Sequence, residues 1–302
     1  MEFHVSPLIK PEQNSGVKEK PFFDDPYAYI TKMDPLTRHD FYYIQKKIEQ
    51  GWITERDIEI VKFIFVHRWL TLSQITRLFF PDTEREQTAR NRVRKMMKHG
   101  LIRKLQWTSY SSPRENRPSY YELGASGADI LKYRFGMVLG HRDPRMPKPT
   151  TMLFRMKYIV TNELYIHLRE NFNMVHFEFH PILTMKEEQQ IPTAKYVLRN
   201  PKGKEMTFYL VVHREDEKWL KTLRYQAQFY KTYLGTVEKG AILVILVSTG
   251  EKAELANKVM EQEGASGYVW YVTDEELYNK EVKLTQGFFV FQDGQKTYYD
   301  LQ

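Results

Sequence analysis

The feature that most constrains this chain is an ordered series of local structure signals between residues 51 and 123. Three short segments with apolar residues at helical spacing come first, and two short segments with strand character follow them around a polar loop. The predicted elements are helices that begin at Thr54, at Thr71 and at Asp82 or Thr83, and strands at Leu101–Gln106 and Ser119–Leu123. A chain with this order folds as three packed helices and a hairpin.

The limits of these helices rest on capping residues. Thr54 stands three residues before Asp57, and Thr71 stands three residues before Gln74. A hydroxyl followed three positions later by an acid or an amide forms the reciprocal capping box that starts a helix. Gly100 ends the third helix, because glycine readily adopts the left-handed conformation that commonly follows a helix.

The third predicted helix has two chemically different sides. On a wheel of about 100° per residue, one side is apolar and holds Ala89, Val93, Met96 and Met97. The other side is polar and basic and holds Gln87, Asn91, Arg94, Lys95 and Lys98. We expect the apolar side to pack in the core and the basic side to point away from it.

Positive charge is concentrated in the same part of the chain. The whole chain has 45 Lys and Arg against 38 Asp and Glu, a formal net charge of +7. Residues 51–135 alone hold 16 basic and 9 acidic side chains, so this segment carries the whole surplus. From Arg90 to Arg117, nine basic residues accompany a single acid, Glu115. Such a cluster suits a phosphate backbone, and the alternative is a basic helix face that is merely solvated.

Three helices followed by a two-stranded ribbon is the element order of the winged helix-turn-helix. In that arrangement the third helix enters the major groove of DNA and the ribbon lies on the flanking backbone. Asn and Gln suit adenine and Arg suits guanine, whereas other cations contact phosphates. The residues expected to contact double-stranded DNA are Gln87, Thr88, Asn91, Arg94, Lys95 and Lys98 on the third helix, and Arg103, Lys104, Arg114 and Arg117 on the ribbon.

Chain length and proline positions predict four segments. A chain of 302 residues is expected to form two domains. Residues 1–36 hold five prolines and are predicted to be an irregular arm, and residues 37–140 form the DNA-binding domain. Residues 141–150 hold three prolines and form a linker, and residues 151–302 form the second domain.

The second half of the chain alternates helix and strand signals. A helix is predicted at 151–171, and Ala241–Val247 is an uninterrupted apolar run typical of a strand that is covered on both faces. A final hairpin is expected to turn at Asp293 and Gly294. The predicted fold class is therefore α/β (α+β), with an α/β sandwich around a mixed sheet in the second domain.

Two absences in the sequence narrow the function classes. The chain has no cysteine, which excludes disulfides, thiol nucleophiles and Cys-ligated zinc sites. No stretch approaches the roughly 18 consecutive apolar residues of a membrane span, and no apolar targeting core stands at the start. We therefore expect a cytoplasmic protein with no membrane partner.

Several short motifs, taken in order, resemble the replication-relaxation family of plasmid and mobile-element proteins. The resemblance covers residues 51–135 well and continues more weakly into the second half, for example with Thr161-Asn162-Glu163. The main motifs are Leu70-Thr71-Leu72-Ser73-Gln74-Ile75, Thr88-Ala89-Arg90-Asn91-Arg92-Val93, Gly100-Leu101-Ile102 and Arg117-Pro118-Ser119-Tyr120-Tyr121-Glu122-Leu123. The resemblance implies an N-terminal winged helix joined to a restriction-endonuclease-like domain, in proteins of plasmid replication, DNA relaxation or related control.

The nuclease-like fold that the resemblance implies would hold a divalent metal between acidic residues, and this sequence lacks them. Family members often carry an Asp after the Pro where this chain has Thr193, and the acidic pair expected on the next strand falls on Val211 and His213. These side chains do not supply the oxygen ligands that Mg²⁺ requires. We therefore expect a catalytically silent domain with no metal and no cofactor.

The leading hypothesis is a non-enzymatic DNA-binding protein of a plasmid or mobile element that acts in replication, DNA relaxation or transcriptional control. Its nuclease-like half would form a homodimer or recruit a replication or relaxation protein. Two alternatives stay open. One is a metal-dependent DNA nuclease or nickase with relocated acids, for example Glu163 with Asp216, and the other is a scaffold whose winged helix binds protein.

Overall fold

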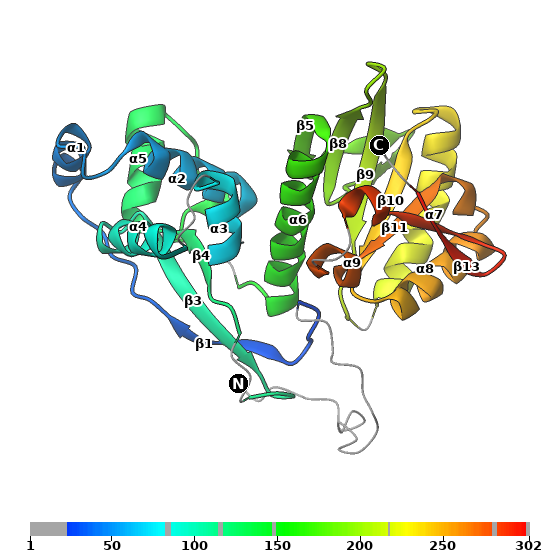
Figure 1. Cartoon of the computed structure of the whole chain (residues 1–302), viewed down its shortest axis with the longest axis horizontal. Helices are drawn as coiled ribbons and strands as arrows, with labels where there is room; N and C mark the ends of the chain where they lie inside the picture. The colour runs from blue at the N-terminus through cyan, green and yellow to red at the C-terminus, as the bar shows by residue number, and fades with distance from the viewer. Residues whose placement is uncertain are drawn as a thin grey trace.

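The computed structural model describes residues 23–81, 86–113, 117–146, 149–216, 218–279 and 283–299. These residues form a mixed α/β fold with two lobes (Figure 1). The N-terminal lobe runs from β1 (Ala28–Met33) to α5 (Ala125–Phe135), and the C-terminal lobe begins with α6 (Met152–Asn171). None of the helices in the described ranges combines the length and the hydrophobicity that crossing a lipid bilayer requires.

The first two predicted helices begin at the predicted residues, whereas the predicted start of the third helix, Asp82 or Thr83, lies outside the described residues. The helix α2 (Glu55–His67) starts after Thr54 and α3 (Leu72–Phe79) starts after Thr71, and both carry the predicted capping box. The predicted hairpin is also present, because its two strands pair antiparallel with Ile102 opposite Leu123. The bounds are Phe41–Glu49 for α1, Glu55–His67 for α2, Leu72–Phe79 for α3, Glu86–Lys98 for α4, Ile102–Ser109 for β3, Tyr120–Leu123 for β4 and Ala125–Phe135 for α5.

The strand β1 (Ala28–Met33) lies in a segment for which the sequence predicted no regular structure. It pairs antiparallel with β3, and β2 (Leu70–Thr71) pairs with β4, which gives the sheet order β1-β3-β4-β2. The prediction of an irregular arm at residues 1–36 is therefore wrong for these six residues. Their own strand signal is weak, and the edge of the longer β3 supplies the backbone hydrogen bonds that make them a strand.

The residues just before β1 bridge the two lobes. Asp24 is buried and accepts a hydrogen bond from Lys252 Nζ in the C-terminal lobe at 2.6 Å. Asp25 forms an ion pair at 3.5 Å with Arg117, which lies in the loop between β3 and β4 of the N-terminal lobe. Two adjacent carboxylates thus tie the C-terminal lobe to the hairpin.

The C-terminal lobe is built on a seven-stranded mixed sheet with the order β13-β12-β11-β10-β9-β8-β5. The strands β9, β10 and β11 are parallel and are joined by helical crossovers, whereas the other neighbours are antiparallel. The bounds are Asn173–Phe179 for β5, Ala194–Arg199 for β8, Glu205–Val212 for β9, Trp219–Thr236 for α7, Ile242–Val247 for β10, Gly250–Gln262 for α8, Val269–Thr273 for β11, Asp274–Tyr278 for α9, Phe289–Gln292 for β12 and Gln295–Tyr298 for β13. A separate small hairpin contains β6 (Leu183–Met185) and β7 (Glu188–Gln190).

Two predictions for this lobe are confirmed. The uninterrupted apolar run forms β10, a central strand between β9 and β11, and its residues from Leu243 to Val247 are buried. The predicted turn residues Asp293 and Gly294 lie between β12 and β13, with φ angles of 50° and 76°. Glycine takes such an angle without strain, which suits it to a tight hairpin turn.

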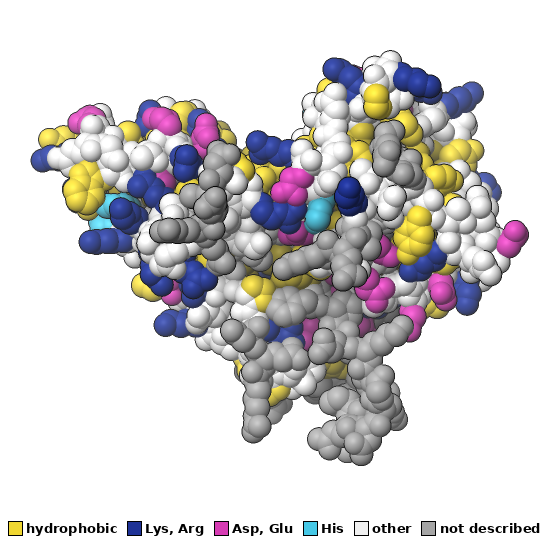
Figure 2. Space-filling view, in the orientation of Figure 1, with side chains coloured by type: hydrophobic (Ala, Val, Ile, Leu, Met, Phe, Trp, Pro, Cys, Tyr) yellow, Lys and Arg dark blue, Asp and Glu magenta, His cyan; other side chains and the backbone are white. Residues whose placement is uncertain are grey.

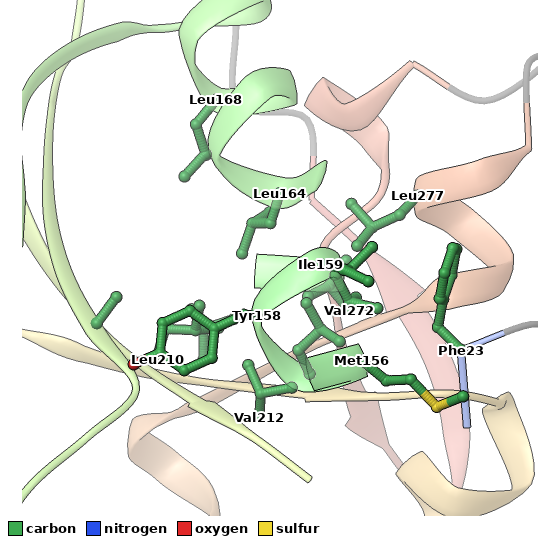
Figure 3. Packing of buried hydrophobic residues seen from close by; sticks show 14 of the residues in the cluster. Phe23, Met156, Tyr158, Ile159, Leu164, Leu168, Leu210, Val212, Val272 and Leu277 are labelled. Carbon is green, nitrogen blue, oxygen red and sulfur yellow. The ribbon is translucent and has the colours of Figure 1, made fainter. Parts of the chain in front are cut away.

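The helix α6 is the part of the C-terminal lobe that packs against the N-terminal lobe. Figure 3 shows Ile159 of α6 near Val272 and Leu277 of the C-terminal lobe. The same buried cluster includes Trp69 of the N-terminal lobe. Apolar packing therefore joins the two lobes directly, although the sequence predicted a linker between them at residues 141–150. The domain boundary at that segment stays a prediction.

Polar contacts reinforce this interface. The buried side chain of Asn162 donates hydrogen bonds to the carbonyl oxygens of His67 at 3.1 Å and Trp69 at 2.8 Å. Its amide oxygen lies 2.7 Å from His67 Nδ1. Gln74 Nε2 donates to the carbonyl oxygen of Ile159 at 2.8 Å. The Asn162 of the Thr161-Asn162-Glu163 motif thus joins α6 to the N-terminal lobe.

Candidate nucleic-acid interface

One side of α4 holds this helix on the N-terminal lobe. Ala89, Val93 and Met96 are at most 1% exposed and belong to the apolar core of that lobe. The opposite side is solvent-exposed and polar, as expected for an amphipathic helix. It presents Gln87, Thr88, Asn91, Arg94, Lys95 and Lys98. The structure therefore brings the six residues predicted on this helix to one exposed face.

The side chains of this exposed face contact mainly one another. Gln87 Nε2 donates a hydrogen bond to Asn91 Oδ1 at 3.0 Å, and Arg94 Nη1 reaches the same oxygen at 3.5 Å. Among the described residues, no carboxylate forms an ion pair with Arg94, Lys95 or Lys98. Figure 2 shows Lys and Arg side chains gathered on this part of the N-terminal lobe. The face is thus a concentration of positive charge.

Arg92 lies on the same helix but is used inside the protein. Its Nε donates to Asp57 Oδ1 at 2.7 Å, and its Nη2 donates to Thr54 Oγ1 at 3.0 Å. Asp57 is 1% exposed, so the guanidinium neutralises a buried carboxylate at the start of α2. Arg92 therefore fixes α4 against α2 and sets the direction in which the exposed face points.

A groove of about 1470 Å³ runs along one flank of α4, and we call it the inter-lobe groove. Its first wall belongs to α4 and β3 and includes Arg90, Arg94 and Lys104. Its second wall belongs to α6 and α9 and includes Glu163 and Tyr278. Figure 2 shows the surface hollowed between the two lobes. The groove thus has a basic wall on the N-terminal lobe and a mixed wall on the C-terminal lobe.

Glu163, the acid on the mixed wall, already has partners within the protein. Glu163 accepts a hydrogen bond from Gln74 Nε2 at 2.9 Å and forms an ion pair with Arg77 of α3. Burial acts to raise the pKa of Glu163, but His167, Arg77 and Gln74 together hold this pKa below its usual value. Glu163 is therefore an ionised group that attaches α6 to α3.

A smaller hollow of about 500 Å³ also borders α4, and we call it the notch. It is lined by Thr54, Arg56, Phe80, Thr88, Asn91, Arg92 and Lys95. The exposed cation Arg56 was not among the residues predicted from the sequence. Its nearness to Lys95 depends on how α2 packs against α4, and no local sequence signal reports this packing.

The cations predicted on the ribbon differ in whether they are open to a ligand or paired within the protein. Lys104 is partly buried and lines the inter-lobe groove. Arg103 Nε donates to Glu122 Oε1 at 2.6 Å, and the Arg103 side chain is only 14% exposed. Arg114 lies outside the described residues. Lys104 is therefore placed to meet a ligand, whereas Arg103 is paired across the hairpin.

Arg117 is placed inside the protein, which corrects its assignment as a phosphate contact at the ribbon. Its side chain is 5% exposed, forms an ion pair with Asp25 and lies 4.7 Å from the ring centre of Trp107. The acid that neutralises Arg117 comes from the arm, 92 positions earlier in the chain. A sequence count of charges around the ribbon therefore overestimates the cations that face outward.

Thr193, Val211 and His213 stand at the positions where a nuclease-like domain would have acidic metal ligands. These residues lie near the ends of β8 and β9. The hydroxyl of Thr193 accepts a hydrogen bond from the backbone N–H of Val212 at 3.1 Å. Val211 and His213 are buried, and burial lowers the pKa of His213 to about 3. Within the described part of the chain, no three His, Asp or Glu side chains group together in a way that could hold a metal ion.

Two comparisons with known proteins gave a match, one to a solved structure and one to a family model. A solved structure titled "Structure of EndoMS in apo form" is 12% identical, with 54% of this chain and 57% of that chain covered and a TM-score of 0.17. Similarity at that TM-score carries no argument about fold or activity. Residues 61–181, from within α2 to just beyond β5, match the family model described as Replication-relaxation, so this segment of the chain is similar to that family.

Proposed function

We propose that this chain is a non-enzymatic duplex-DNA-binding protein that acts in the replication or relaxation of plasmid or mobile-element DNA. The observation that carries the proposal is the exposed face of α4, where Arg94, Lys95 and Lys98 have no carboxylate partner among the described residues. The family description supports a role connected with replication or relaxation. DNA is a polyanion, so its binding would fit both the basic face of α4 and a role in replication or relaxation.

The arrangement of α2, α3, α4 and the β3–β4 hairpin suits a winged helix-turn-helix. An α-helix with its side chains is about 10–12 Å across, and the major groove of DNA is about 12 Å wide. In this interpretation α4 enters the groove, with Gln87 and Asn91 facing base edges and Arg94, Lys95 and Lys98 near bases or phosphates. Lys104 contributes from the hairpin side.

The C-terminal lobe takes a second role in this proposal. We infer a restriction-endonuclease-like domain without catalysis, because Thr193, Val211 and His213 supply no carboxylate at the ends of β8 and β9. Its function is then to form a homodimer or to hold a replication or relaxation protein next to the bound DNA.

The decisive experiment is a titration of a fluorescent duplex at several salt concentrations, followed by anisotropy. The double variant Arg94→Ala/Lys95→Ala is expected to bind at least tenfold more weakly, and its salt slope is expected to flatten by about 0.9 for each lost phosphate contact. Lys258→Ala is the matched control, because Lys258 is an exposed cation on α8 in the other lobe. This control is expected to bind like the wild type.

Two results would contradict the proposal. Equal binding by the double variant and the wild type would remove α4 from the interface, and absence of duplex binding at low salt would favour the protein scaffold. The non-enzymatic part is tested with supercoiled plasmid in Mg²⁺ or Mn²⁺. Nicking that Glu163→Gln abolishes, with the variant still folded by circular dichroism, would show a nuclease instead.

A further inference from the structure

The inter-lobe groove and the notch lie on opposite flanks of α4. On this basis we propose that the two strands of one duplex are seated separately, with phosphates of one strand in the groove and phosphates of the other strand in the notch. The proposal assigns the notch as a phosphate site and Arg56 as its principal cation. It rests on the proposed function, because it specifies how the same helix meets duplex DNA.

The positions along α4 separate the two hollows. Arg90, Arg94 and Met97 line the inter-lobe groove, whereas Thr88 and Lys95 line the notch. With about 100° per residue, these two sets lie on opposite sides of a crest formed by Gln87 and Lys98, and Asn91 lies at the edge of this crest that borders the notch. The hollows share no lining residue. The crest is thus flanked by one hollow on each side.

The notch has the chemistry of an anion site. Arg56 is exposed, and its guanidinium carbon lies 4.9 Å from the centre of the Phe80 ring. This stacking restricts the long side chain and lowers the entropy lost when the guanidinium binds a ligand. Lys95 supplies a second cation from α4. Among the described residues no acid forms an ion pair with either of them.

The acids nearest in sequence to Arg56 have other partners. Asp57 is bound by Arg92, and Glu55 forms an ion pair with Arg134 of α5 at 3.0 Å. The third cation of the notch, Arg92, is therefore neutralised, while Arg56 and Lys95 have no acidic partner within the described part of the chain. This division makes the notch basic, although α2 begins with an acidic turn.

The groove side also carries basic side chains, which come from different elements. Arg90 and Arg94 come from α4, and Lys104 comes from β3. A helix in the major groove has one sugar-phosphate backbone on each of its two flanks, because the groove is bounded by both strands. A crest with cations on both flanks matches this geometry. A helix that only touched one strand would need cations on one flank alone.

The first test measures the salt dependence of binding to a duplex of about two helical turns, selected by the wild-type protein from random sequences. Arg56→Gln removes the charge and keeps most of the length of the side chain. We expect about threefold to tenfold weaker binding and a salt slope lower by about 0.9, because one phosphate contact is lost. Arg56→Lys is expected to restore most of the salt slope. Lys258→Gln serves as the control for loss of a distant charge.

The second test identifies the DNA strand that each hollow contacts. Neutral methylphosphonates replace phosphates on one strand of the selected duplex and then on the other strand. We expect the effect of Arg56→Gln to vanish when one strand is neutralised, and the effect of Lys104→Gln to vanish only when the opposite strand is neutralised. Such a result would show that the two hollows seat different strands.

Three outcomes would separate the failure of this inference from failure of the proposed function. If the wild type does not bind duplex DNA, the proposed function fails and this inference with it. If the wild type binds and Arg94→Ala/Lys95→Ala weakens binding, but folded Arg56→Gln binds like the wild type, only the assignment of the notch is wrong. Loss of both effects on the same neutralised strand would also overturn the two-sided seating.

Discussion

Two arginines on one helix show how strongly a residue's role depends on its partners. Arg92 and Arg94 are separated by one position, yet Arg92 is bound to buried Asp57 whereas Arg94 is exposed. Helical periodicity predicted the exposure of Arg94 correctly, because side chains on one face recur at fixed spacing. It could not predict the ion pair of Arg117 with Asp25, because that acid comes from the other end of the lobe's sequence.

Two buried histidines, His67 and His213, and the half-buried His180 predict a loss of stability in acid. Burial lowers the pKa of His67 and His180 to about 4 and that of His213 to about 3. In the unfolded chain a histidine has a pKa of about 6.5, so below this pH the unfolded state binds more protons than the folded state. The stabilising contribution is complete above pH 6.5 and is lost as the pH falls towards 4.

The measurement is the free energy of unfolding in urea at several pH values between 7 and 4.5. We expect it to fall with decreasing pH by up to about 1.4 kcal/mol per pH unit for each histidine that stays neutral in the fold. His67→Gln should reduce this slope, whatever it does to stability at pH 7. His176→Gln, at an exposed position of β5, is the matched control. An unchanged slope in His67→Gln would contradict the expectation.

At the scale of elements, the start of α5 is packed closely on the backbone that enters β3. A Cβ atom added to Gly127 would collide with the carbonyl oxygen of Leu101. Alanine is normally better than glycine in a helix by about 1 kcal/mol. Here the collision is with backbone, which cannot rotate away, and we expect Gly127→Ala to lower the free energy of unfolding by about 1–3 kcal/mol.

Chemical denaturation followed by circular dichroism checks this value. Gly267→Ala is the control, because a Cβ atom there meets nothing within 4 Å. If Gly127→Ala were as stable as the wild type, the close contact between α5 and the start of β3 would be more adaptable than the structure indicates.

The elements that the sequence predicted are those with strong local signals. Capping boxes marked α2 and α3, and a continuous apolar run marked β10. The strands β1, β6 and β7 were not predicted, because short strands depend on a neighbouring strand for their hydrogen bonds. The hollows on the two sides of α4 also depend on packing between distant segments, so periodicity revealed the exposed face of α4 but not the notch.

At the scale of the whole molecule, the shared packing around α6 predicts that the two lobes unfold together. Asn162 binds the carbonyl oxygens of His67 and Trp69 from the other lobe. Asn162→Ala leaves these buried groups without their partner, and we expect a loss of about 2–3 kcal/mol in the free energy of unfolding.

Hydrogen exchange shows whether the loss of stability is shared by both lobes or is confined to one of them. We expect Asn162→Ala to increase the exchange of the most protected amides of α2 and β10 by the same factor, because one cooperative transition exposes both. Exchange that increases in α2 but not in β10 would show that the lobes unfold independently. Independent unfolding of the lobes would also support the predicted domain boundary at residues 141–150.

The bridge formed by Asp24 has a consequence for biosynthesis. Its partner Lys252 lies 228 positions later in the chain. The N-terminal lobe emerges from the ribosome first, and its apolar core can fold while the rest of the chain is being translated. The tie between arm and C-terminal lobe can close only after α8 has emerged. A nascent protein therefore acquires its basic helix early, but the second wall beside that helix is secured only near the end of translation.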